Sequence, residues 1–119
     1  MPYISTASRK RLGNEMSPNP QTCGELNYQF TRYLQDGLIE QWPYRCLMNR
    51  YVELKGLSYN TLNDVIGAVT GALMEMRRRD KGHAVSGSTL YSALQEWYAE
   101  VAGPYEDEKI AANGDVWNT

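Results

Sequence analysis

Apolar residues recur at three- and four-residue spacing in several separate stretches of this chain. The clearest stretch covers residues 59–79, where the spacing predicts one helix with a single buried stripe. Further stretches predict helices over residues 23–38, 43–55 and 89–102. No stretch alternates convincingly with the period of two that indicates a half-buried strand. The sequence therefore predicts an all-α fold, a small bundle of about four helices followed by a short helical turn over residues 105–112.

Polar residues that can cap a helix lie at the start of three of these stretches. Thr22 and Glu25 match the capping box, in which the two residues satisfy each other's free backbone N–H groups. Asn60 and Ser88 are expected to cap the third and fourth helices. The capping box thus explains Glu25 by a structural role, without a catalytic one.

Glycine and proline mark the expected breaks between helices. Gly56 is expected to end the second helix. Residues 80–88 predict a loop that carries the single histidine, His83. The Gly-Pro pair at 103–104 is expected to break the fourth helix, and the Asn-Gly pair at 113–114 to form a C-cap or a turn.

The domain organisation follows from the same pattern. The first residues include the stretch Ser-Pro-Asn-Pro at 17–20, whose prolines disfavour a helix. Residues 1–21 are therefore expected to form a flexible arm, and residues 22–119 a single helical domain. A chain of 119 residues buries a modest core, so we expect a homo-oligomer to complete the burial.

Small residues line one face of the third predicted helix, namely Gly67, Ala68, Gly71 and Ala72. Each glycine costs a helix interior about 0.5–1 kcal/mol relative to alanine. Two of them in one helix suggest that another backbone or a ligand approaches this face closely. An alanine- and glycine-rich core helix is the simpler interpretation, and close pairing of helices across a dimer is a further one.

Composition narrows the classes of function. The net charge of −2 argues against generic nucleic-acid binding, which needs a basic surface. No apolar run approaches the length of about 20 residues that spans a bilayer, and no signal-peptide segment is visible at the N-terminus. We therefore expect a cytosolic protein without a membrane partner. Cys23 and Cys46 are then expected to be free thiols, and with one histidine they make no metal-site spacing.

Three arginines, Arg77, Arg78 and Arg79, end the third predicted helix. Cations in a last turn complement the helix dipole, but guanidinium groups also bind phosphate oxygens in pairs. The chain contains nine Tyr and three Trp but one Phe, and such side chains suit interfaces and base stacking. The candidate ligand-binding residues are these arginines together with Tyr105 and Trp117. We see no catalytic set and no cofactor motif, which favours a binding protein over an enzyme.

Three stretches of the chain resemble a family of small bacteriophage proteins that is known as a domain of unknown function: residues 24–28, residues 63–67 and the tail formed by residues 104–117. The chain departs from that family by an extra loop and helix over about residues 79–96. The resemblance implies a phage origin and a setting in the cytoplasm of an infected bacterium, and it implies no activity.

A weaker similarity is to all-α nucleotide pyrophosphohydrolases, which hold Mg²⁺ with paired acidic residues on two packed helices. On that similarity Glu25 and Asp64 would be the metal ligands. A Mg²⁺ site for catalysis needs three or four convergent carboxylates, and the acidic doublets are missing here.

Three hypotheses follow. The first is a phage-encoded binding protein that sequesters a nucleotide-type signalling molecule and so antagonises bacterial antiviral defence. The second is a protein-binding or virion accessory protein, and the third is a degenerate relative of the pyrophosphohydrolases.

Overall fold

The computed structural model describes residue 7, residues 20–79 and residues 84–114, and these residues form helices and no strand. Most of the predicted arm, His83 and Trp117 lie outside the described residues. The elements in chain order are α2 (Cys23–Gln35), α3 (Gln41–Lys55), α4 (Tyr59–Arg79), α5 (Ala84–Trp97), the π-helical segment η1 (Tyr98–Ala102) and α6 (Gly103–Asn113). The all-α prediction is confirmed.

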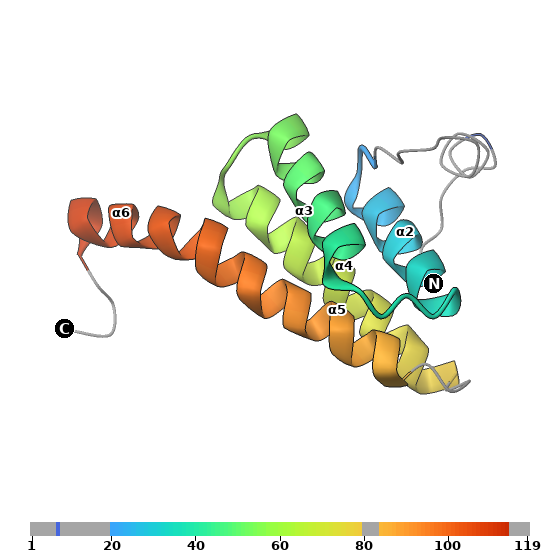
Figure 1. Cartoon of the computed structure of the whole chain (residues 1–119). Helices are drawn as coiled ribbons and strands as arrows, with labels where there is room; N and C mark the ends of the chain where they lie inside the picture. The colour runs from blue at the N-terminus through green and yellow to red at the C-terminus, as the bar shows by residue number, and fades with distance from the viewer. Residues whose placement is uncertain (1–6, 8–19, 80–83, 115–119) are drawn as a thin grey trace.

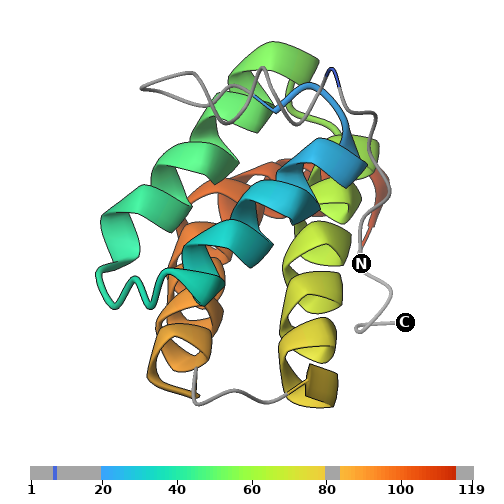
Figure 2. The same cartoon turned by 90° about the vertical axis from the view of Figure 1, so that its right-hand side faces the viewer.

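The helices form two layers, with α2 and α3 lying across α4 and α5 (Figure 2). The main contacts between the layers are those of α2 with α4 and of α3 with α5. Helix α6 continues from α5 and extends beyond the bundle at one end (Figure 1), and none of its residues is buried. The molecule is accordingly elongated, with principal extents of 45 × 29 × 23 Å.

One core is shared by α2, α3, α4, α5 and η1. Its largest side chain is Trp97, which is fully buried and donates from Nε1 to Asn49 Oδ1 at 3.0 Å. Tyr44 and Tyr51 bury their rings and direct their hydroxyl groups to oxygen acceptors, as buried tyrosines usually do. The other buried apolar residues are Leu26, Phe30, Leu34, Leu47, Met48, Leu62, Val65, Ala68, Val69, Ala72, Leu90, Ala93 and Ala102.

Helix α2 begins at the predicted cap. The Glu25 N–H donates to Thr22 Oγ1 at 3.1 Å, and the Glu25 carboxylate accepts from the backbone N–H of Gln21 at 3.0 Å. The helix ends at Gln35, earlier than predicted, because Gly37 adopts a φ of 72° and forms a Schellman motif. This motif turns the chain before Leu38, the predicted last residue.

The starts of α3 and α4 differ slightly from the prediction. Helix α3 begins at Gln41, so Pro43 lies within its first turn, where a proline is tolerated. The expectation that Asn60 caps α4 is wrong, because Asn60 lies inside the helix and Ser58 Oγ accepts from the Thr61 N–H at 3.2 Å. The predicted bounds of α4 are confirmed, and Gly56 ends α3 with a φ of 86°.

The small residues of α4 serve contacts within the chain. Ala68 and Ala72 are buried, and Asn27 Nδ2 of α2 donates to the Ala68 carbonyl oxygen at 2.9 Å. A Cβ atom at Gly71 would lie 2.7 Å from this nitrogen, so Gly71 makes room for the Asn27 side chain. Gly67 faces open space. The interpretation of α4 as a core helix with close contacts at its small residues is thus confirmed for Ala68, Gly71 and Ala72, but not for Gly67.

Helix α5 begins at Ala84, so the prediction of a loop through residue 88 is wrong, as is a capping role for Ser88. Ser86 and Gly87 favour turns locally but are buried here against distant residues. Ser86 Oγ donates to the Leu34 carbonyl oxygen at 3.3 Å. Tertiary contacts therefore extend the helix through residues that resemble a loop in sequence.

The expected break at residues 103–104 does not occur. The Gly103 N–H donates to the Tyr98 carbonyl oxygen, five residues earlier, and this π-helical spacing precedes Pro104, which has no N–H to donate. The Tyr98 hydroxyl donates to the Glu106 carboxylate across this segment, which raises the pKa of Tyr98. The expected short C-terminal turn is therefore a helix of 11 residues that continues from α5.

Candidate functional site

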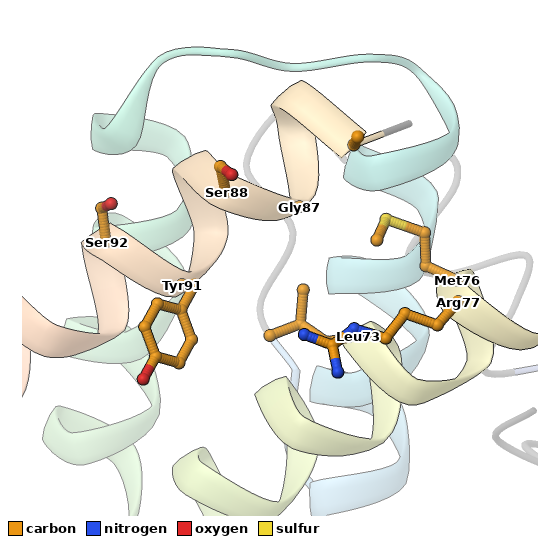
Figure 3. A pocket seen from close by; sticks show the side chains of 8 residues that line it. Leu73, Met76, Arg77, Gly87, Ser88, Tyr91 and Ser92 are labelled. Carbon is orange, nitrogen blue, oxygen red and sulfur yellow. The ribbon is translucent and has the colours of Figure 1, made fainter. Parts of the chain in front are cut away.

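A pocket of about 580 Å³ lies between the C-terminal half of α4 and the N-terminal half of α5, and we call it the α4–α5 pocket. Its size falls within the usual range of small-molecule sites. The described residues that line it are Leu73, Met76, Arg77, Ala84, Gly87, Ser88, Tyr91 and Ser92. Figure 3 shows the Arg77 side chain extending from α4 toward α5, and the Tyr91 ring extending from α5 toward α4.

The three consecutive arginines at the end of α4 point in different directions around the helix, so they do not all share one partner. Arg78 Nη2 lies 2.9 Å and Arg79 Nε 2.6 Å from Glu75 Oε1, at the spacings of three and four residues that place side chains together on a helix. The hydrogen bond from Arg78, and then that from Arg79, hold the pKa of Glu75 at about 2. Arg77 is two residues from Glu75 and faces the pocket instead.

Arg77 makes no hydrogen bond and no ion pair with the part of the chain that the structure describes. Its guanidinium group therefore keeps its donors available at the pocket. Of the three predicted arginines, only this one lines the pocket, while Arg78 and Arg79 bond to their own helix.

The α5 wall carries residues that sequence reasoning missed. Ser88, Tyr91 and Ser92 follow the spacing of one helix face, and Tyr91 is exposed over 53% of its surface. The sequence places Ser88 in a predicted loop, and nothing in it relates Tyr91 and Ser92, which lie in the predicted helix, to the arginines of α4. The floor is apolar where Gly87 lets Met76 pack closely, since a Cβ atom at Gly87 would lie 2.6 Å from Met76 Cε.

The pocket has the donor set of an anion site with an aromatic wall. Arg77 can donate two parallel hydrogen bonds to a phosphate or carboxylate, and the hydroxyl groups of Ser88 and Ser92 add neutral polar groups to the α5 wall. The Tyr91 ring offers a surface for a planar group. Among the described lining residues there is no carboxylate, thiol or imidazole to act as a general base, so the arrangement favours binding over proton transfer.

Tyr105, the aromatic residue predicted to join the arginines, lies elsewhere. Its ring packs edge-on against Tyr59, with the centroids 5.2 Å apart, and Lys109 Nζ lies 5.5 Å from its centroid. Tyr59 begins α4, and Arg77 lies about 27 Å farther along that helix at 1.5 Å per residue. The structure therefore does not bring Tyr105 and Arg77 together within one chain.

Glu25 and Asp64, the two candidate metal ligands, both accept hydrogen bonds that stabilise the fold. Glu25 is 7% exposed and accepts from the Gln21 N–H at the helix cap. The Asp64 carboxylate accepts from the Tyr51 hydroxyl at 2.8 Å, and the Asp64 carbonyl oxygen accepts from Cys23 Sγ at 3.4 Å. These bonds join α2, α3 and α4.

Asp64 also lines a second hollow of about 460 Å³, together with Cys23 and Lys55, and Glu25 is not among its lining residues. Burial, and then the charge of Asp64, raise the pKa of the Cys23 thiol, which disfavours the reactive thiolate. Across residues 20–79 and 84–114, no three His, Cys, Asp or Glu side chains gather closely enough to hold a metal ion. The described residues thus do not assemble the carboxylate set of a pyrophosphohydrolase.

Comparison with protein families gives a match over residues 1–84 to the family described as Domain of unknown function (DUF6899). The chain belongs to this family. The match includes α2, α3 and α4, and it ends at the first residue of α5. Two of the three stretches that carry the resemblance, residues 24–28 and 63–67, lie inside the matched range, and the tail at residues 104–117 lies beyond it.

Comparisons with curated proteins and with solved structures gave no match. None of the helices in the described part of the chain combines enough length with enough apolar sequence to span a bilayer.

Proposed function

We propose that this protein is a small helical binding protein that holds a nucleotide-type molecule in the α4–α5 pocket. The observation that carries the proposal is the pairing of Arg77, which has no partner among the described residues, with the exposed ring of Tyr91 across one pocket. A guanidinium group and an aromatic ring on facing walls match the two parts of a nucleotide, its phosphate and its base.

The energies of such contacts are sufficient for specific binding. Hydrogen bonds to a charged group contribute about 1.5–3 kcal/mol, and stacking of a base on an aromatic side chain about 1–3 kcal/mol. The Met76 and Leu73 side chains add apolar contact area at the floor. The walls come from two different helices, and the α5 wall lies beyond the residues that match the family except for Ala84.

A protein that binds without catalysis acts by removing its ligand from solution. On the resemblance to phage proteins, we propose that it works in the cytoplasm of an infected bacterium, where capture of a nucleotide-type signal would antagonise antiviral defence. Such capture requires one binding site for each molecule removed, so the role predicts a tight complex and an abundant protein.

Self-association is part of the proposal. Helix α6 has no buried residue, and helices of its length are marginal in water without a packing partner. Ile110 on this helix is 40% exposed. A second copy of the chain that covers α6 would bury this surface.

The test is native mass spectrometry of the purified protein after incubation with a small-molecule extract of bacteria whose defence has been activated. The wild type is expected to retain an added mass of nucleotide size and to reveal the oligomeric state. Arg77→Ala should lose this mass, and Arg78→Ala, the matched control on the same turn, should keep it. A wild-type protein without added mass, or equal retention by Arg77→Ala, would contradict the proposal.

A specific observation also favours a protein-binding role. Trp42, Ile39 and Val85 are 65%, 64% and 66% exposed. Thr89 Oγ1 lies 3.2 Å from the Ile39 carbonyl oxygen and 3.1 Å from that of Val85, so Ile39 and Val85 meet at one junction between the α2–α3 turn and α5. Trp42 follows Ile39 by three residues, at the start of α3. Exposed tryptophan is enriched at binding hot spots. This candidate predicts that a polypeptide co-purifies in fixed stoichiometry with the wild type and is lost from Trp42→Ala.

A further inference from the structure

The α4–α5 pocket contains a single full charge among its described lining residues, the guanidinium group of Arg77. The remaining polar groups are the hydroxyls of Ser88, Tyr91 and Ser92, which are neutral donors and acceptors. One guanidinium group can neutralise and orient one phosphoryl group.

The next two arginines are not free to extend this site. Both bond to the Glu75 carboxylate, whose side chain is 13% exposed and which stays ionised at neutral pH. Moving Arg78 or Arg79 into the pocket would break an existing ion pair and leave Glu75 with fewer donors. If Arg78 or Arg79 were to bind a second phosphoryl group, that group would therefore have to displace a bond that the described part of the chain already makes.

Polyphosphate sites commonly neutralise their ligand with a metal ion that carboxylates hold, or with several cationic side chains. Neither arrangement is present among the described residues that line the pocket, since they include one cation and no carboxylate. The floor formed by Leu73, Met76 and Gly87 is apolar and lies beside the aromatic wall. It suits a ring rather than further phosphate.

We propose that the pocket takes a ligand with one phosphoryl group joined to an aromatic ring, as in a nucleoside monophosphate or a phosphodiester-linked nucleotide, and that it discriminates against nucleoside triphosphates. This inference rests on the proposed function and specifies its ligand class. Arg77 holds the phosphoryl group, and Tyr91 with the apolar floor holds the ring.

Isothermal titration calorimetry of the full chain can test this without a divalent metal ion, in buffer that contains a chelator. The probes are the common nucleosides, their 5′-monophosphates and their 5′-triphosphates, each titrated separately. For the base that binds best, the monophosphate is expected to bind about 10- to 100-fold more tightly than the nucleoside. The triphosphate is expected to bind no more tightly than the monophosphate, within about threefold.

Two variants assign the effect to residues. Arg77→Ala is expected to make the monophosphate bind as weakly as the nucleoside, and Arg78→Ala to leave both affinities unchanged. Because Arg77 is exposed and bonds to no described residue, its removal should leave the thermal unfolding midpoint unchanged.

The outcomes separate this inference from the proposed function. A triphosphate that binds about tenfold more tightly than the monophosphate, with the gain lost in Arg78→Ala, would overturn the single-phosphoryl site and leave the binding function standing. Equal affinity for nucleoside and monophosphate would also overturn it. If no probe binds at all, the proposed function fails and the inference fails with it.

Discussion

The contact between Asn27 and Gly71 provides a sharp test of how α2 packs on α4. Replacing Gly71 with alanine would place a Cβ atom 2.7 Å from Asn27 Nδ2, which is about 0.7 Å closer than the 3.4 Å at which ordinary contact begins. The Asn27 amide would have to move, and its hydrogen bond of 2.9 Å to the Ala68 carbonyl oxygen would be lost. Gly67 lies one turn earlier and has nothing within 4 Å, so Gly67→Ala is the matched control.

The magnitudes follow from two opposing effects. Alanine stabilises a helix interior by about 0.5–1 kcal/mol relative to glycine, and both variants gain this. Loss of the Asn27 hydrogen bond costs about 0.5–1.5 kcal/mol, and only Gly71→Ala loses it. We therefore expect Gly67→Ala to raise the free energy of unfolding by about 0.5–1 kcal/mol, and Gly71→Ala to have a free energy of unfolding about 0.5–1.5 kcal/mol below that of Gly67→Ala.

The assay is urea unfolding followed by far-UV circular dichroism, at one protein concentration for all variants. A double-mutant cycle with Asn27→Ala isolates the contact, because in that background Gly71→Ala should stabilise as much as Gly67→Ala. If Gly71→Ala and Gly67→Ala stabilise the wild-type background equally, the result would falsify the packing of Asn27 over Gly71.

Three further predictions concern the core, the first cap and acid stability. Trp97→Ala should lower the free energy of unfolding by about 3–5 kcal/mol, measured in urea, because it removes the largest fully buried side chain and leaves a cavity. Thr22→Ala should cost about 0.5–2 kcal/mol through loss of the α2 cap, with Thr22→Ser restoring most of it in the same assay. The pKa of Glu75 is lowered from 4.5 to about 2 when the chain folds, so its contribution to stability is complete above about pH 4.5 and is lost as pH falls toward 2. The unfolding free energy of Glu75→Gln should therefore fall less between these pH values than that of the wild type, and an equal fall would show that the Arg78 ion pair does not act in solution.

Local chemistry accounts for the parts of the fold that could be predicted. Thr22 caps α2 and Gly56 ends α3, and each acts on backbone groups within a few residues. Their roles can therefore be predicted from the sequence. The start of α5 could not be predicted in this way, because Ser86 is buried against the carbonyl group of Leu34, which is 52 residues away in sequence. Such contacts override the turn preference of serine and glycine.

The candidate site was predictable only in part. The three arginines are chemically alike, but the spacing from Glu75 already indicates that Arg78 and Arg79 can pair with it and that Arg77 cannot. The aromatic partner could not be found from sequence, because nothing local to Tyr91 indicates that its face of the helix lies beside Arg77 of α4. The high Tyr and Trp content of the chain suggests Tyr105 as the aromatic partner of the arginines. In the structure Tyr105 packs against Tyr59, at the opposite end of α4 from Arg77.

The most direct test of the central claim is where a nucleotide binds. Isotope-labelled protein titrated with the tightest-binding nucleoside monophosphate should show its largest amide chemical-shift changes at Arg77, Ser88 and Tyr91, which lie on the two walls of the α4–α5 pocket. Changes centred on Tyr59 and Tyr105 at the far end of α4, or no change at saturating nucleotide, would contradict the account.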